Sequence, residues 1–226
     1  MSSSRPLRIL TINGSLRRDS YHGQLLELLT SLAPEGMTFD RLDGLGALPL
    51  YDQDLDGRPA RPEVQQLRDT IAAADGLVIA SPEINHSISA ALKNALDWAS
   101  RPAGASGLLG SHVFAFTAST SANGGLRGLA ELSRILRDQG AFVVPQPEVC
   151  IGVVDTKLRV DPATGAVELD DPAAVGLLGI GLQVLAASID TGIGQVLTDA
   201  SAQVNRFRLE VFAAAQDGRE QPADGG

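Results

Sequence analysis

Cysteine is almost absent from this chain of 226 residues, which contains only Cys150. A single cysteine cannot form an internal disulfide, and no Cys or His stands at metal-ligand spacing around it. A disulfide framework is therefore excluded, and we predict no metal site. Free cysteine is among the residue types most often buried, so the sequence favours a core position for Cys150 over a nucleophile.

Basic residues are outnumbered, with 18 Lys and Arg against 27 Asp and Glu, and the net charge is -9. An acidic protein repels phosphate-rich partners at long range, so nucleic acid and anionic membrane surfaces are not expected as partners. The N-terminal residues 1–5 lack the apolar core of a signal peptide. With the near absence of cysteine, this predicts a cytoplasmic protein.

Long apolar runs are also scarce, and the one charge-free run is residues 172–189, which nearly reaches the length of a membrane span. Gln183 and several glycines interrupt the run, and Asp171 and Asp190 flank it without a basic anchor. A buried helix or a subunit-interface helix is therefore favoured over a membrane span. Residues 196–215 resemble a second, amphipathic helix, so residues 172–215 are predicted to be a helical extension that contributes to oligomerisation.

The remaining pattern is one of alternating strands and helices. Apolar runs typical of strands occupy residues 7–12, 37–43, 77–80, 113–116 and 142–144, and helical spacing follows at 25–32, 62–71, 88–96 and 126–136. Such alternation predicts an α/β fold with a parallel sheet covered by helices on both faces. We expect one domain over residues 1–216, a long loop at 44–62, a two-stranded excursion turning at Thr164 and Gly165, and a disordered tail at 217–226.

Polar loops follow three of these strands, at residues 13–22, 81–87 and 117–128. The carboxyl ends of parallel strands meet at one edge of the sheet, where ligands bind in such folds. In the first loop Gly14 permits a tight turn, Ser15 and Ser20 offer hydroxyls, and Arg17 and Arg18 offer charge beside a helix N-terminus, a combination that holds phosphate. The alternative is that Ser20 is only an N-cap and that the arginines are solvated.

Four segments together resemble the NADPH-dependent FMN reductase family: "NGSLRRDSYHGQLLELL", "LPLYDQDL", "IASPEINHSISAALKNALDWASRP" and "SANGGLRGLAELSRILRDQGAFVVP". They cover residues 7 to 152 in the order and spacing of that family, which includes quinone, chromate and azo-dye reductases. The resemblance implies a flavodoxin-like, doubly wound sheet of five parallel strands in the order 2-1-3-4-5, with the C-terminal helices added to it.

The resemblance also implies where FMN binds. The phosphate loop would contain Ser15, Arg17, Ser20, Tyr21 and His22; the loop under the isoalloxazine ring would contain Pro82, Glu83, Ile84, Asn85, His86 and Ser87; and the loop at the pyrimidine edge would contain Ser119, Gly124 and Gly125. The helical extension could also wall this site. No side chain is assigned as a catalytic residue, because the flavin carries the chemistry.

Two residues depart from the family pattern: His22 replaces the usual Asn, and Ile84 replaces the usual Tyr. A protonated His22 would donate more strongly to phosphate, which suggests that flavin retention depends on pH near neutrality. Ile84 removes an aromatic ring, so cofactor affinity or the preferred hydride donor could differ. For His86, a role in shaping the loop or in an oligomer contact is favoured over acid–base chemistry.

The implied function is that of an FMN-dependent NAD(P)H oxidoreductase that reduces quinones, free flavin or other small electron acceptors. NADPH is the expected donor, NADH is possible, and a homodimer or homotetramer is expected. One alternative is a flavin reductase that supplies reduced FMN to a partner monooxygenase. Another is a flavodoxin-like electron carrier or flavin-binding module without turnover.

Overall fold

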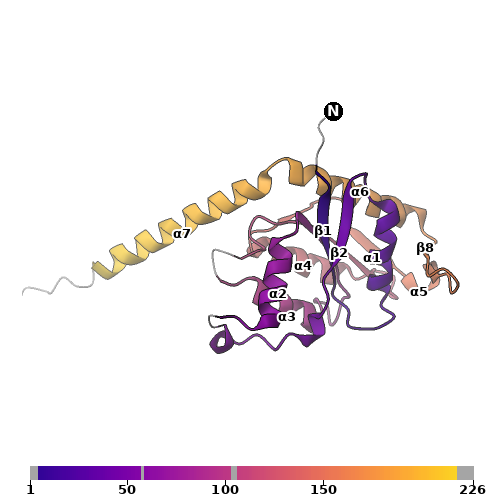
Figure 1. Cartoon of the computed structure of the whole chain (residues 1–226), viewed down its shortest axis with the longest axis horizontal. Helices are drawn as coiled ribbons and strands as arrows, with labels where there is room; N and C mark the ends of the chain where they lie inside the picture. The colour runs from indigo at the N-terminus through magenta and orange to yellow at the C-terminus, as the bar shows by residue number, and fades with distance from the viewer. Residues whose placement is uncertain (1–4, 57–58, 103–105, 218–226) are drawn as a thin grey trace, which may run out of the picture.

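The computed structural model describes residues 5–56, 59–102 and 106–217, with the backbone alone at 208, 209 and 211–217. Its main sheet is parallel, in the order β2-β1-β3-β4-β5, and β6 also pairs with β4. Figure 1 shows β1 and β2 side by side. The strands are β1 (Leu7–Asn13), β2 (Met37–Arg41), β3 (Gly76–Ala80), β4 (His112–Ser119), β5 (Phe142–Val143) and β6 (Val149–Gly152). The predicted flavodoxin-like order is thus confirmed.

Helices cover both faces of this sheet, because its central strands are apolar on both sides. One core lies under α2 (Pro62–Ala72), α3 (Ala90–Ala99) and α4 (Leu126–Asp138), and the other lies under α1 (Tyr21–Leu32) and α6 (Pro172–Asp190). Every residue of β3 is buried, as its continuous apolar run predicts. Trp98 is also fully buried and belongs to the first core.

The edge of the sheet beyond β4 is more elaborate than the sequence pattern indicates. β5 has only two residues, and β6 continues the pairing with β4 after Pro145 and Pro147, neither of which can donate a ladder hydrogen bond. After the short helix α5 (Val154–Lys157), β7 (Leu158–Val160) and β8 (Val167–Leu169) pair antiparallel. This confirms the predicted excursion around Thr164 and Gly165, which β7 and β8 enclose.

In its described part, the long loop after β2 contains two short 3₁₀ turns, η1 (Leu45–Ala47) and η2 (Gln53–Leu55). It is fastened to α3, because Asn94 Nδ2 and Trp98 Nε1 each donate a 2.8 Å hydrogen bond to the carbonyl of Pro49. The backbone N–H of Tyr51 returns a 2.7 Å bond to Asn94 Oδ1. An otherwise irregular segment is therefore held beside the carboxyl edge of the sheet.

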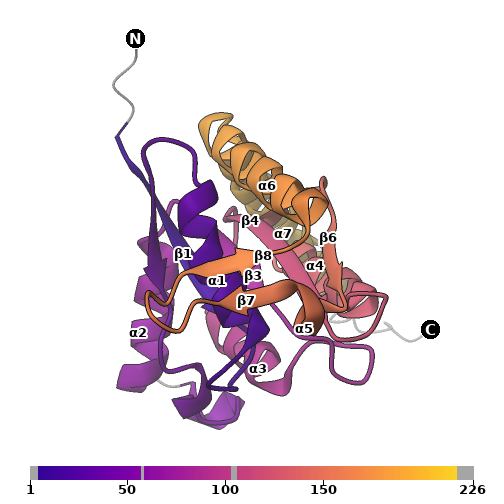
Figure 2. The same ribbon diagram turned by 90° about the vertical axis from the view of Figure 1, so that its right-hand side faces the viewer.

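The C-terminal extension is helical, as predicted. By length and composition α6 could cross a membrane, but core helices of soluble proteins pass the same test. Here its inner face packs on the sheet: Leu178, Leu182 and Leu185 are fully buried, and Gly181 lies against the Phe114 ring. Figure 2 shows α6 lying across the sheet, whereas α7 (Ile193–Asp217) leaves the body as a rod in Figure 1. The predicted tail at 217–226 lies outside the described residues except for Asp217.

Candidate cofactor site

The first loop builds an anion-binding corner where β1 passes into α1. Ser20 is the N-cap of α1, and its Oγ accepts a 3.3 Å hydrogen bond from Gly23 N. Asn13 Oδ1 accepts a 3.0 Å bond from the backbone N–H of Ser15, which fixes the turn. The first N–H groups of a helix have no partner inside it and carry the positive end of its dipole. This corner therefore presents hydroxyls and N–H groups to an anion.

Arg17 adds a positive charge to this corner. Its guanidinium carbon lies 5.3 Å from the centre of the Tyr21 ring, and its Nη2 donates to the carbonyl of Asp19 at 2.9 Å. The stacked ring and the carbonyl hold the cation beside the helix start. Arg18, which the sequence offers as a second cation, does not line the cavity described below.

The ends of β1 and β3 approach closely under the same corner. Gly14 N donates a 2.8 Å hydrogen bond to the carbonyl of Ala80, and a Cβ on Gly14 would lie 3.2 Å from that oxygen. Ser89, the N-cap of α3, donates from Oγ to the carbonyl of Gly14 at 2.5 Å and accepts from Leu92 N at 3.1 Å. The N-terminus of α3 is thereby drawn into the site, a contribution that the sequence analysis missed.

His22 has a different role from the one suggested by its sequence position. The ring is buried, and its Nε2 accepts a 3.2 Å hydrogen bond from the backbone N–H of Ala118 in β4. Burial lowers the pKa of His22 to about 4, against smaller raising contributions from the backbone of Ser81 and Ala118. The ring is therefore neutral near pH 7, and the expected strengthening of phosphate binding by a protonated His22 is wrong. His22 instead ties α1 to the end of β4.

The second loop is a tight two-residue turn. Ile84 N and Ser87 N each donate to the other residue's carbonyl, at 2.8 and 3.0 Å, while Asn85 and His86 adopt φ values of 50° and 64°. Both central residues are left-handed, as in the hairpin turns that asparagine tolerates well. The turn leaves the Ile84 side chain about half exposed, at 52%. An apolar side chain thus stands on the rim of the site.

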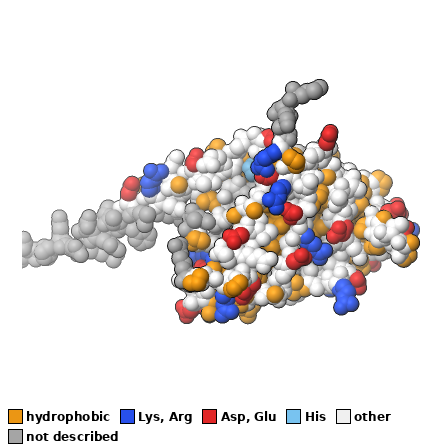
Figure 3. All heavy atoms as spheres, viewed as in Figure 1, with side chains coloured by type: hydrophobic (Ala, Val, Ile, Leu, Met, Phe, Trp, Pro, Cys, Tyr) orange, Lys and Arg blue, Asp and Glu red, His pale blue; other side chains and the backbone are white. Residues whose placement is uncertain are grey.

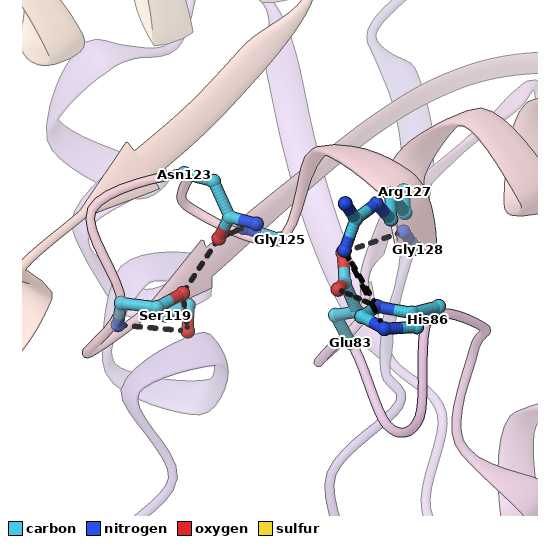
Figure 4. Close-up of polar contacts among 8 residues, drawn as sticks. Glu83, His86, Ser119, Asn123, Gly125, Arg127 and Gly128 are labelled. Atoms are coloured by element: carbon cyan, nitrogen blue, oxygen red, sulfur yellow. Dashed lines mark hydrogen bonds and ion pairs between the residues drawn. The ribbon is translucent and has the colours of Figure 1, made fainter.

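Glu83 connects this second loop to the start of α4 (Figure 4). Its Oε2 accepts a 2.9 Å hydrogen bond from Gly128 N, and its Oε1 lies 3.2 Å from His86 Nδ1. Arg127 Nη1 reaches the same His86 nitrogen at 2.9 Å. The Gly128 N–H is the largest of the causes that lower the pKa of Glu83, so the carboxylate stays ionised. Two of the three loops are therefore joined by one side chain.

The third loop is held by its own polar side chains. Ser119 Oγ lies 2.8 Å from Ser121 Oγ, and Ser121 Oγ donates to Asn123 Oδ1 at 2.6 Å. Ser119 and Asn123 are labelled in Figure 4. Gly124 and Gly125 have φ values of 63° and 88°. A Cβ on Gly125 would lie 2.5 Å from Thr117 Oγ1, so this turn has no room for a larger residue.

These loops enclose a cavity of about 550 Å³, which lies in the range of small-molecule sites. The predicted site residues that line it are Ser15, Arg17, Ser20, Tyr21, His22, Pro82, Glu83, Ile84 and Ser119. Those that do not are Asn85, His86, Ser87, Gly124 and Gly125. Gly14, which the sequence analysis placed at the turn of the first loop, also lines it. The lining residues that sequence reasoning missed are Leu16, Ser89, Ala90, Ala91, Ala118 and Thr120. No residue of α6 or α7 contributes among the described residues, so the extension does not wall this cavity.

A second cavity, of about 580 Å³, lies beside α2 and is lined by both signs of charge, including Asp56, Arg68, Asp69 and Arg101. Among the described residues it shares no lining residue with the cavity at the carboxyl edge. The thiol of Cys150 is also unsuited to nucleophilic work, because burial raises its pKa to about 11. Among the described residues, no group of three or more His, Cys, Asp or Glu could hold a metal ion.

The cavity at the carboxyl edge fits a phosphate-bearing planar cofactor. At one end it has hydroxyls, a guanidinium and a helix N-terminus, and elsewhere it has apolar walls from Leu16, Ile84 and the start of α3. The approach of Gly14 to Ala80 leaves the backbone itself as part of the floor. With the β2-β1-β3-β4-β5 sheet, these features define a flavodoxin-like, FMN-type binding protein.

Comparison with known proteins specifies the family. The model of the NADPH-dependent FMN reductase family matches residues 7–155, and the chain belongs to this family. Similar proteins include a quinone reductase of Escherichia coli (strain K12), 40% identical over 167 residues that cover 73% of this chain and 86% of that one. A 2-hydroxy-1,4-benzoquinone reductase of Burkholderia sp is 54% identical over 101 residues, 44% of this chain and 54% of that protein.

A solved structure is similar as well. FerB, a flavoenzyme NAD(P)H:(acceptor) oxidoreductase from Paracoccus denitrificans, superimposes with a TM-score of 0.70 at 26% identity, covering 82% of this chain and 98% of that one. The resemblance and the fold class expected from the sequence are both confirmed. The protein is an oxidoreductase of a family that uses FMN and NAD(P)H.

Proposed function

We propose that this protein is an FMN-dependent NAD(P)H oxidoreductase that reduces quinones. The observation that carries the proposal is the cavity itself, which combines an anion corner at the start of α1 with apolar walls of a size suited to a flat ring system. The chemistry that FMN supplies when bound is hydride transfer between NAD(P)H and the acceptor.

The residues of this chain bind and orient the cofactor. Ser15, Ser20 and the first N–H groups of α1 would donate hydrogen bonds to the phosphate oxygens, and Arg17 would neutralise part of the phosphate charge. Glu83 would keep the second loop at a fixed distance from α4, so that the floor for the ring does not shift as substrates exchange. His22, neutral and buried, supports α1 from behind.

Two features favour a quinone over a charged acceptor. Leu16 and Ile84 line the cavity and are 62% and 52% exposed, so the rim presents apolar surface to an incoming molecule. Two relatives are named quinone reductases, and a third is named NADPH:quinone oxidoreductase. NADPH is the proposed donor with NADH also accepted, since one relative is named for NAD(P)H.

The proposal extends to the state and place of the protein. We expect a homodimer or homotetramer in the cytoplasm, without nucleic acid or membrane partners. On the face shown in Figure 3, Lys and Arg side chains are scattered among acidic ones rather than gathered into a basic patch, which agrees with the net charge of -9.

An anaerobic titration tests this function. The purified protein, loaded with FMN, should lose its visible flavin absorbance when NADPH is added and regain it when a benzoquinone follows. Ser20→Ala should weaken FMN binding about 5- to 30-fold, because it removes both an N-cap and a phosphate donor. The matched control is Ser31→Ala in the last turn of α1, where Oγ bonds only the carbonyl of Leu28. Absence of FMN binding, or bleaching that quinone does not reverse, would reject the proposal.

A further inference from the structure

The helix α7 carries an apolar stripe that the reductase site does not use. The stripe consists of Ile193, Leu197, Ala200, Val204 and Phe207, whose spacings alternate between four and three residues. In the sequence, Val211 and Ala214 continue the same alternation to the end of the helix. A sustained repeat of this kind is the pattern of a coiled-coil seam.

The body of the protein covers only the first part of this stripe. Ile193 and Leu197 are half-buried where α7 begins, and Gly194 is buried against Gly110. Beyond that point Ala200 is exposed, and Val204 and Phe207 are 49% and 65% exposed. Figure 1 shows why: from there on, α7 extends past the edge of the body with no other element beside it. The seam is therefore partnered at its start, whereas its described side chains at 200, 204 and 207 are exposed.

A lone rod of this composition is poorly stable in water. Most helical stability in proteins comes from packing of an apolar face rather than from helix propensity, and the described side chains in the exposed part of this stripe lack such packing. A membrane is a poor partner for the rod, because interfacial helices carry Lys and Arg on their polar face. The helix α7 instead has three acidic residues, Asp199, Glu210 and Asp217, against Arg206 and Arg208, a net charge of -1.

We propose that the seam of α7 pairs with the same seam of a second copy of this chain. Residues 200–217 span about 27 Å, and two such helices packed about 9 Å apart would bury roughly 1,000 Å² in total, the minimum for a specific interface. Most of the net charge of -9 lies outside α7, so two copies repel each other least when they associate through this helix. This pairing goes beyond the reductase function and does not depend on it.

Mass measurements on the full chain test the pairing. Light scattering behind gel filtration, and sedimentation over a concentration series, should show that wild type associates. Phe207→Glu places a charge in the seam and should weaken that association at least 100-fold, lowering the mass at micromolar concentration. Asn205→Glu is the control: it adds the same charge two residues away, off the seam, and should leave the mass unchanged. Both variants should bind FMN like wild type, because α7 does not line the cavity.

A gain-of-association variant guards against misfolding as the cause. Ala200→Leu fills a small position of the seam and should tighten association about three- to tenfold, whereas Ala202→Leu, an equal change away from the seam, should not. A wild-type chain that stays monomeric at 100 micromolar overturns the proposal. So does a Phe207→Glu chain with wild-type mass at every concentration, or equal behaviour of the two leucine variants.

Discussion

Three glycines in α6 make the packing of this helix directly testable. Gly176 and Gly179 have nothing within 4 Å of a built Cβ, whereas a Cβ on Gly181 would overlap the ring of Phe114 in β4. All three lie in one helix of 19 residues and share its helical backbone. The same substitution, Gly to Ala, should therefore have opposite effects at neighbouring positions.

The expected magnitudes follow from two competing terms. Replacing a helix-interior glycine by alanine gains about 0.5–1 kcal/mol, because the unfolded chain loses conformational freedom. At Gly176 or Gly179 no steric cost opposes this gain. At Gly181 the added methyl must displace a fully buried Phe114 ring, and overpacking costs about 1–3 kcal/mol. We expect Gly176→Ala to raise Tm by about 2–3 °C and Gly181→Ala to lower it by a similar amount or more.

Calorimetry or urea unfolding of the two variants and wild type, with FMN present throughout, gives the comparison. Because the three proteins differ by one methyl group in one helix, effects on expression or on the flavin cancel. If Gly181→Ala is as stable as Gly176→Ala, then α6 does not lie on β4, and the assignment of this charge-free helix to the core of the domain is wrong.

Three further predictions concern the site. Between pH 7 and pH 5, the free energy of unfolding should fall by about 2 kcal/mol more in wild type than in His22→Gln, because a His whose folded pKa is about 4 takes up a proton only on unfolding. Equal pH slopes of the two proteins in urea titrations would contradict this. FMN affinity should not vary through His22 between pH 6 and 8. Gly125→Ala should cost about 2 kcal/mol more than Gly36→Ala in thermal melts, since both residues have positive φ but only Gly125 faces Thr117; similar costs would show that the third loop relaxes easily. Glu83→Ala should raise the FMN dissociation constant about fivefold, while Glu83→Gln, which can still accept from Gly128 N, should stay within about twofold of wild type in fluorescence quenching; equal losses would mean that charge rather than the hydrogen bond matters.

Periodicity and turn chemistry were enough to predict an α/β fold with a parallel sheet, because short apolar runs alternate with helical stripes along the chain. The order of the strands came from the family resemblance. The same reasoning missed β6: the prolines at 145 and 147 break the run, and pairing with β4 resumes only through contacts distant in sequence. The convergence of the three loops on one site was also predictable, because the carboxyl ends of parallel strands meet at the same edge of the sheet.

Individual site residues were harder to predict, because a side chain's direction depends on packing. Ser89 and Ala90 reach the cavity only because α3 starts beneath Gly14. His86 points instead to Arg127 and Glu83, outside the cavity lining. The burial of His22, and with it the low pKa, depends on β4, which lies far along the chain. No local pattern carries that information.

The turn at residues 84–87 has a consequence for how such an enzyme could diversify. Its two closing hydrogen bonds join main-chain atoms only, so these bonds do not depend on the Ile84 side chain. The hydrogen bond that connects this loop to α4 is made by the neighbouring residue, Glu83, which accepts from Gly128 N. A substitution at position 84 can therefore change the apolar rim of the pocket without removing the main-chain hydrogen bonds of the turn or the contact between Glu83 and α4.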